Sequence, residues 1–154
     1  MAIYSYQLMD TSPSLVNYCG PIVRSAGWYG HTKGLHTIFI SVANFQGLLY
    51  IEASQMINPT DSDWFSIPYP SPFNQTPYIS YPRIGAGYII DPNNNASGET
   101  SQWGFNFQVN CLWLRARFDR TNLLPAFIAY NNMGSSWQQP VAYLGKVIQI
   151  LVNY

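Results

Sequence analysis

The segment Phe105 to Phe118 limits what this chain can fold into more than any other part of the sequence. Successive side chains of a β-strand point to opposite faces, so the spacing of apolar residues shows which face is buried. Phe105, Phe107 and Val109 occupy odd positions, whereas the later apolar residues occupy even ones. Those later residues are Leu112, Leu114, Ala116 and Phe118. One flat strand cannot bury both sets on the same side, so we expect an irregularity near Asn110: a β-bulge, which we favour, or a tight reversal.

After this irregularity, the outward face of the strand carries Trp113, Arg115 and Arg117. The simplest interpretation is a solvated outer surface. Tryptophan and arginine are also among the residues most enriched where proteins bind one another. We therefore treat these three as candidate partner-contact residues. Their arginines would face either a neighbouring subunit or a nearby acidic turn such as Asp119.

The composition favours an all-β fold. The chain has 154 residues, which is enough for one domain whose core needs no metal or disulfide. Only 9% of the residues are charged and 16% are aromatic, and 11 glycines and 11 prolines supply many turns. No stretch predicts a long helix. We expect an antiparallel β-sandwich, jelly-roll-like, with little or no helix.

The net charge and the apolar pattern limit the kinds of partner that this chain is expected to bind. The formal net charge is zero, whereas nucleic-acid binding ordinarily needs a basic excess, so we expect no nucleic acid. A weakly charged, tyrosine-rich surface is poorly protected against self-association, and we expect a homo-oligomer. No apolar stretch approaches the roughly 18 to 20 residues of a membrane span, so we expect no membrane partner. The first ten residues lack the pattern of a signal peptide, which predicts a soluble protein made in the cytoplasm.

Two regions follow from the spacing of strands and turns. Residues 1–34 predict a strand and then a glycine- and proline-rich loop or arm, and residues 35–154 predict a single β-sandwich domain. Leu35 to Phe45 and Gly47 to Ser54 predict a β-hairpin, because a short, glycine-bearing link joins them. The segment Leu123 to Tyr130 fits either a strand or a single helical turn. Shorter strands are expected at Ile3 to Leu8, Trp64 to Ile67, Arg83 to Ile90 and within Val141 to Tyr154.

Residues 68–82 form a loop rich in proline and tyrosine, with five prolines at Pro68, Pro70, Pro72, Pro77 and Pro82. Proline stiffens the backbone and leaves it unable to donate ladder hydrogen bonds, so we expect an extended surface excursion. Aromatic rings on such a loop offer contact area at low entropic cost. The candidate contact residues here are Tyr69, Phe73, Tyr78 and Tyr81. A loop packed on its own domain is an equally good interpretation.

The sequence contains no recognised catalytic motif and no Cys or His spacing suited to a metal. We therefore expect a protein that is not an enzyme, with no catalytic, cofactor-binding or metal-binding residues. Asp61 and Asp63 lack the further oxygen ligands of a calcium loop and are expected to form a turn. Cys19 and Cys111, the only cysteines, are expected to be free, buried thiols.

Five segments, taken in order, carry a resemblance to a known class of proteins. They are Leu48 to Ala53, Asp63 to Phe65, Phe105 to Phe107, Leu112 to Arg117, and Gly145 to Tyr154. This pattern, which spans Thr37 to Tyr154, resembles small virion structural proteins of tailed bacteriophages, particularly those infecting cyanobacteria.

The resemblance implies a β-sandwich subunit of the virion head, neck or tail, which reaches the virion after synthesis in the host cytoplasm. Its implied partners are other copies of itself, as a trimer or a higher oligomer, and other virion proteins. The alternative is a carbohydrate-binding β-sandwich that recognises the host surface. In that case exposed tryptophan and tyrosine rings would stack on a glycan.

Overall fold

The computed structural model describes residues 4–31, 33–69, 76–81, 83, 98–123 and 144–154. Within this part the chain forms ten strands and three short 3-10 turns, and it contains no α-helix. The strands are β1 (Ser5–Asp10), β2 (Asn17–Cys19), β3 (Val23–Arg24), β4 (Leu35–Phe45), β5 (Gly47–Ser54), β6 (Phe65–Ser66), β7 (Ile79–Tyr81), β8 (Glu99–Gln108), β9 (Trp113–Asp119) and β10 (Lys146–Asn153). The 3-10 turns are η1 (Ala26–Tyr29), η2 (Asp61–Asp63) and η3 (Thr121–Leu123).

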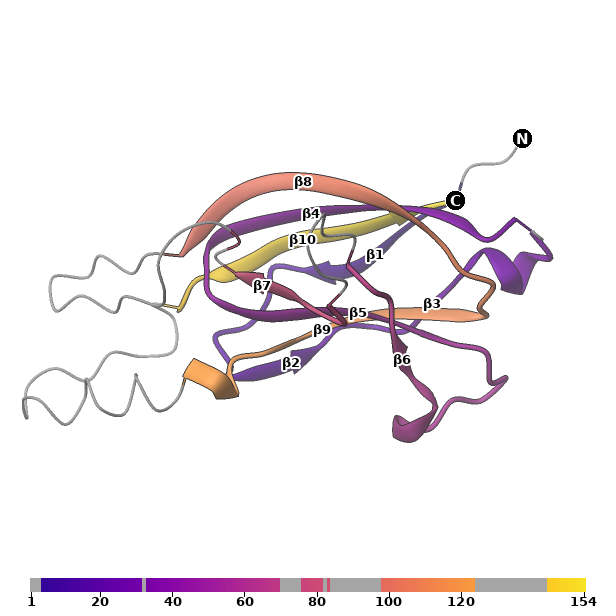
Figure 1. The fold of residues 1–154 in the computed structure, drawn as a ribbon, viewed down its shortest axis with the longest axis horizontal. Coiled ribbons are helices and arrows are strands. Elements are labelled where there is room, and N and C mark those ends of the chain that lie inside the picture. The colour runs from indigo at the N-terminus through magenta and orange to yellow at the C-terminus, as the bar shows by residue number, and fades with distance from the viewer. Residues whose placement is uncertain (1–3, 32, 70–75, 82, 84–97, 124–143) are drawn as a thin grey trace, which may run out of the picture.

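The strands form two antiparallel sheets that pack face to face as a β-sandwich (Figure 1). Sheet A has the order β1-β10-β4-β8. Sheet B has the order β2-β9-β5-β6, with β3 also pairing with β9 and β7 with β5. If β2 and β3 count as one edge of sheet B and β6 and β7 as the other, these orders give the interlocked Greek keys of a jelly roll. The predicted all-β sandwich is confirmed.

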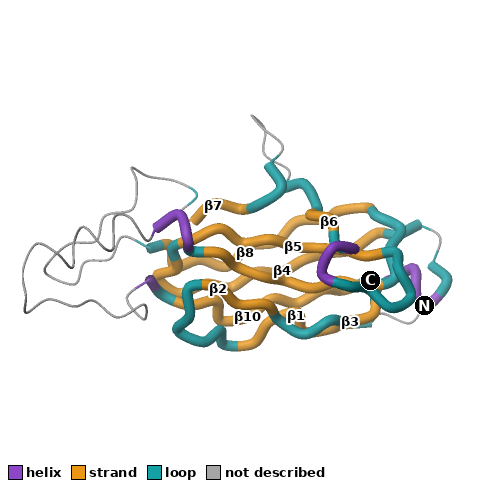
Figure 2. The backbone as a smooth tube through the Cα atoms, turned by 90° about the horizontal axis from the view of Figure 1, so that it is seen from below, coloured by secondary structure: helices purple, strands orange, loops and turns teal. Residues whose placement is uncertain are grey.

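The strands of both sheets run along the long dimension of the molecule (Figure 2). The first and last described residues meet at one end, where Tyr4 and Tyr154 exchange two backbone hydrogen bonds of 2.8 and 3.0 Å. No helix among the described residues is long and apolar enough to cross a membrane.

The irregularity near Asn110 is a crossing between the two sheets. β8 ends at Gln108 in sheet A, and β9 begins at Trp113 in sheet B. Because the two sheets face each other across the core, both apolar sets point inward even though their parity differs. The preference for a β-bulge was therefore wrong, while the slip in parity that motivated it is real.

The predicted hairpin between Leu35–Phe45 and Gly47–Ser54 is also wrong, although both strands have the predicted bounds. β4 pairs with β10 and β8, whereas β5 pairs with β9, so the short link joins the two sheets. Gly47 adopts a φ of 140°, a conformation that side-chain-bearing residues rarely adopt. A Cβ atom there would also lie 2.9 Å from Arg120 Cγ.

The amino-terminal segment contributes an edge to each sheet. β1 pairs with β10 in sheet A, and β2 and β3 pair in line along β9 in sheet B. Gly20 lies between β2 and β3, and its N–H donates to the carbonyl of Ala116 at 2.8 Å. A Cβ atom at Gly20 would lie only 2.1 Å from the Leu8 carbonyl oxygen, so the close approach of the two sheets requires glycine here.

The core lies between the sheets and is joined across them by aromatic rings. Phe45 packs edge-on against Tyr81 and Phe118, with ring centres 5.5 Å apart in both cases. Arg120 is fully buried beside these rings, and its Nη2 donates to the carbonyl of Gly145 at 2.9 Å. Burial lowers the pKa of Arg120 to about 10, so its guanidinium remains charged at neutral pH.

Two smaller predictions are resolved by this fold. Both cysteines are free, as expected, and Cys111 is buried, but Cys19 is exposed because β2 lies at the edge of sheet B. Asp63 stabilises a turn, as expected: its Oδ2 accepts hydrogen bonds from the backbone N–H and the hydroxyl of Thr60, both 2.7 Å long. These bonds lower the pKa of Asp63.

Several predictions lie wholly or partly outside the described residues. They concern Arg83 to Ile90 beyond Arg83 itself, Leu123 to Tyr130 beyond the end of η3, and Phe73 in the proline-rich loop.

Candidate functional site

The outer face of sheet B contains the three candidate contact residues of β9. Trp113, Arg115 and Arg117 are half-buried and alternate with the buried Leu114, Ala116 and Phe118. β9 lies between β5 on one side and β2 with β3 on the other. The outward side chains of β9 therefore lie between the two edges of this face, and their outward orientation agrees with the prediction from alternation.

The arginines are held by an acidic residue on the neighbouring strand. Glu52 of β5 stands directly opposite Arg115 in the register, and its Oε2 accepts a hydrogen bond from Arg115 Nε at 2.7 Å. Its Oε1 accepts a hydrogen bond from Arg117 Nε. Glu52 is only 4% exposed. One buried carboxylate thus binds two guanidinium groups, which leaves this triad with a net positive charge.

Each of these arginines also lies over an aromatic ring. The Arg115 guanidinium is 4.2 Å from the ring centre of Trp64, and that of Arg117 is 3.8 Å from the ring centre of Tyr50. Burial raises the pKa of Tyr50, although Arg117 opposes the shift. The exposed Asp61 lies 4.0 Å from Arg115 Nη1 and adds a second, weaker ion pair. The arginines are therefore fixed by their own domain.

Trp113 lies at one end of this face in an apolar cluster. Its ring centre is 4.7 Å from that of Trp28, and its Nε1 donates to the backbone carbonyls of Met56 and Ile57 at 3.0 and 3.2 Å. Trp28, Met56 and Ile57 are 39%, 53% and 70% exposed. We call Trp28, Met56, Ile57 and Trp113 the Trp113 cluster. In this cluster, large apolar side chains are exposed to solvent beside an indole ring that hydrogen bonds hold in place.

The tyrosines predicted as contact residues have different environments. Tyr78 lies on the outer face of sheet B, with its ring edge-on to Tyr50 at 5.8 Å. Tyr69 packs edge-on against Trp103 and Phe105 and so covers the margin of the core. Tyr81 is fully buried, and its hydroxyl accepts a hydrogen bond from Trp103 Nε1 at 2.8 Å. Phe73, the fourth, is outside the described residues.

The sequence predicted that the arginines face either a neighbouring subunit or an acidic turn such as Asp119, and it missed Glu52 as the partner of both. Asp119 accepts hydrogen bonds from the backbone N–H and the hydroxyl of Thr121. The signal for Glu52 was its position two residues after Tyr50, which puts both on the face opposite Leu49 and Ile51. Only the register of β5 against β9 places that face beside the arginines.

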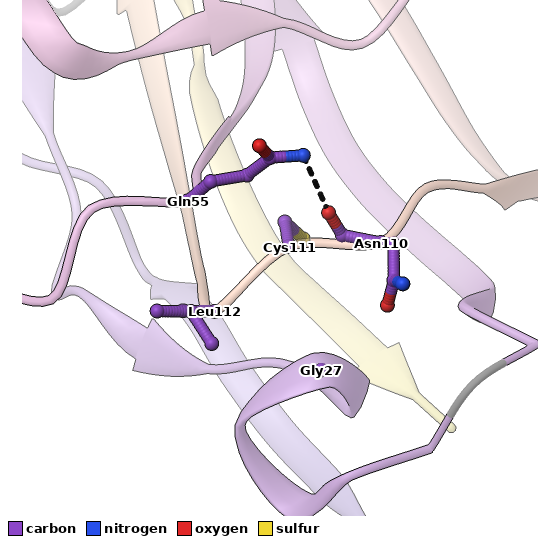
Figure 3. Close-up of a pocket in the computed structure, with 5 residues that line it drawn as sticks. All are labelled: Gly27, Gln55, Asn110, Cys111 and Leu112. Carbon is purple, nitrogen blue, oxygen red and sulfur yellow. Dashed lines mark hydrogen bonds between the residues drawn. The ribbon is translucent and has the colours of Figure 1, made fainter.

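A hollow of about 350 Å³ lies next to the Trp113 cluster, lined by Gly27, Gln55, Asn110, Cys111 and Leu112 (Figure 3). Gln55 Nε2 donates to the carbonyl of Asn110 at 2.8 Å across it. The buried Cys111 thiol lies 3.1 Å from Ser25 Oγ, and burial raises its pKa. A second hollow, of about 260 Å³, adjoins Cys19 and Arg117.

Among the described residues, no group of three or more His, Cys, Asp or Glu side chains is placed to hold a metal ion.

Fold and surface together define the class: an antiparallel β-sandwich of jelly-roll topology whose arginine- and aromatic-rich face lies on sheet B. No protein-family model matches the chain, and neither the curated proteins nor the solved structures include one with significant similarity to it.

Proposed function

We propose that this protein is a non-enzymatic structural component of a bacteriophage virion. It is a jelly-roll subunit that assembles as a symmetric oligomer on the head, neck or tail and contacts other virion proteins. Two arguments support the proposal. The strand pattern from Thr37 to Tyr154 resembles small virion proteins, and jelly rolls recur among viral capsid proteins.

The observation that carries the proposal is the Trp113 cluster. Met56 and Ile57 are more than half exposed, and both lie against an indole that their own carbonyls hold in place. Tryptophan and methionine are enriched in the cores of protein interfaces, where rigid aromatic anchors supply much of the binding energy. The cluster has the chemistry of a docking point for another protein.

Arg115 and Arg117 stabilise this face of sheet B, but their guanidinium groups are already occupied by contacts within the domain. The side chain of Arg115 is only 13% exposed, because Glu52 and Trp64 cover it. Changing Arg115 or Arg117 to Glu would place two or three carboxylates together and unfold the sheet, so such variants cannot test binding. The informative variants are Trp28→Ser and Ile57→Ser, which alter the exposed part of the cluster.

The experiment is imaging and protein analysis of purified phage particles, with sedimentation of the isolated protein. We expect an oligomer in solution and a fixed copy number at one symmetric position in the particle. Trp28→Ser with Ile57→Ser should reduce incorporation at least tenfold, while Asn58→Asp, an exposed change beside the cluster, should not. A protein that is monomeric at every concentration and absent from purified particles contradicts the proposal.

The alternative, glycan recognition, has less support from the geometry. Stacking on a sugar needs a bare ring face, but Tyr50, Trp64 and Trp28 each lie under an arginine. An array of host surface glycans separates the two functions. Binding that is lost in Trp28→Ser would favour the glycan.

A further inference from the structure

The outer face of sheet A differs from that of sheet B in carrying no charged side chain over its centre. Its alternate residues point away from the core, because their neighbours along each strand, such as Ile38, Ile40 and Val152, are fully buried. We call this set the neutral face. It comprises Ser5 and Gln7 of β1, Leu35, Thr37, Phe39 and Ser41 of β4, Gln102, Gly104, Asn106 and Gln108 of β8, and Gln149, Leu151 and Asn153 of β10.

The neutral face has the anatomy of a protein interface. Phe39 stands directly opposite Leu151 on one side and Gly104 on the other, so an apolar centre lies at mid-sheet. Amide and hydroxyl side chains surround it, and two of them are already ordered: Thr37 Oγ1 donates to Asn106 Oδ1 at 2.8 Å. An apolar centre without charged residues, surrounded by a polar rim, is typical of interfaces between proteins.

The absence of charge favours a second copy of this chain as the occupant. In a two-fold contact, each surface meets the same surface of its partner, so any charge near the axis meets its own kind. In a two-fold contact through the outer face of sheet B, Arg115 and Arg117 would lie near the same arginines of the second copy and repel them. The neutral face meets itself without repulsion, and amides and hydroxyls can both donate and accept hydrogen bonds with identical partners.

The size of the face agrees with this occupant. Sheet A has four strands, and β4 is 11 residues long. The four strands have 6, 8, 11 and 10 residues. With strands about 4.8 Å apart and a rise of about 3.3 Å per residue, the face measures roughly 19 by 29 Å, or about 550 Å². A specific interface buries at least about 500 Å² on each partner.

The apolar centre can also meet itself. Phe39 of β4 and Leu151 of β10 stand directly opposite each other in the register. A two-fold axis that runs along the strands between β10 and β4, at the middle of the four-stranded sheet, places the Phe39 side chain of each copy over Leu151 of the other. The two faces then overlap over all four strands.

We propose that the neutral face of sheet A binds the neutral face of a second copy across a two-fold axis. This inference rests on the proposed function, since it assigns the contact through which the oligomer forms. The resulting dimer stacks two sandwiches through their A sheets and leaves both Trp113 clusters outward. Those clusters remain available for other virion proteins.

The test introduces like charges at three exposed positions of the face without changing side-chain shape. The variant is Gln7→Glu with Gln102→Glu and Asn106→Asp, and the matched control is Asn58→Asp with Asn110→Asp, two exposed amides outside the face. Sedimentation equilibrium of the full chain measures the dissociation constant, and circular dichroism verifies the fold. We expect the dissociation constant of the triple variant to be at least 100-fold higher than that of the wild type. High salt should screen the added charges and lower it again in part, and the control should have the dissociation constant of the wild type.

The possible results distinguish a failure of this inference from a failure of the proposed function. A wild-type oligomer that persists unchanged in the folded triple variant overturns this inference and leaves the proposed function standing. A wild-type chain that is monomeric at every concentration and absent from purified particles overturns both. A triple variant that is unfolded at low salt is replaced by Gln102→Glu alone, for which an unchanged dissociation constant counts against the inference.

Discussion

Arg115 and Glu52 face each other across two antiparallel strands, with Arg115 Nε 2.7 Å from Glu52 Oε2. Glu52 also holds Arg117, and each arginine lies on an aromatic ring. A charge this deeply buried is tolerated only because it is paired. The pair therefore favours the register in which β5 and β9 are joined, and with it the position of Trp113 at the end of the sheet.

Removal of the Glu52 charge should destabilise the fold. In Glu52→Gln, two guanidinium groups lose their common carboxylate, and breaking a fully buried pair typically costs about 3–5 kcal/mol. Because the Arg117 side chain remains 32% exposed, we expect a smaller loss of about 2–3 kcal/mol in the free energy of unfolding, measured by urea denaturation.

Asp61→Asn is the matched control for this experiment. Asp61 is fully exposed and lies 4.0 Å from Arg115 Nη1, so solvent screens the pair and its loss should leave the urea midpoint nearly unchanged. Equal effects of the two substitutions would show that Glu52 has no special role.

Stability should fall as the pH falls through the range in which histidine titrates. His36 is fully buried: Nε2 accepts the N–H of Ala26 at 3.3 Å, so the imidazole proton is on Nδ1, 2.7 Å from the Gly34 carbonyl oxygen. Burial lowers the pKa of His36 below its usual 6.5, although the hydrogen bond to Gly34 opposes the shift. Below pH 6.5 His36 binds a proton in the unfolded chain but stays neutral in the folded chain, so a fall in pH favours the unfolded state.

Urea denaturation at several values between pH 5 and 8 measures this effect. The free energy of unfolding should be constant above about pH 7.5 and decline below about pH 6.5, and His36→Gln should remove most of the slope. Asp63 and Glu99 do not contribute in this window. Hydrogen bonds to Asp63 lower its pKa below 3.8, and bonds from Arg83 and Ser101 outweigh burial to lower that of Glu99 below 4.5. A slope that is the same in His36→Gln would contradict this assignment.

Gln46→Met should stabilise the protein. Gln46 is fully buried, and neither of its amide atoms has a hydrogen-bond partner among the residues described. Replacing this amide with a thioether of similar length removes its desolvation cost and should raise the free energy of unfolding by about 1–2 kcal/mol. The measurement is the urea midpoint. Gln46→Asn keeps the amide and loses a methylene, so it should be less stable than the wild type; the prediction is wrong if Gln46→Met is no more stable than Gln46→Asn.

One thiol of the native protein should react with a maleimide, and two should react after denaturation. Cys19 is exposed on β2, whereas Cys111 is 2% exposed and lies against Ser25 Oγ. Partial desolvation raises the pKa of Cys19 above 9.0, so its reaction should still accelerate above pH 9. Mass spectrometry counts the labels. Cys19→Ser should take up none while folded, and labelling of Cys111 in the folded state would contradict the buried position.

Local pattern determined much of the fold. The bounds of β4 and β5, the inward positions of Phe107 and Leu114, and the outward positions of Trp113, Arg115 and Arg117 all follow from alternation along the chain. Alternation reports the side of a strand on which a residue lies, and that information is local.

Only the tertiary structure decided which strands are neighbours. A short link such as Asn44 to Gln46 suits a hairpin as well as a crossing between sheets, because both need only a tight reversal. The same holds for Val109 to Leu112, where a change of sheet produces the parity slip that a bulge would produce. The partner of Arg115 and Arg117 depends on the register of β5 against β9, which sequence spacing does not contain. The sequence alone therefore determined which side chains face outward, and the pairing of distant strands decided which of them meet.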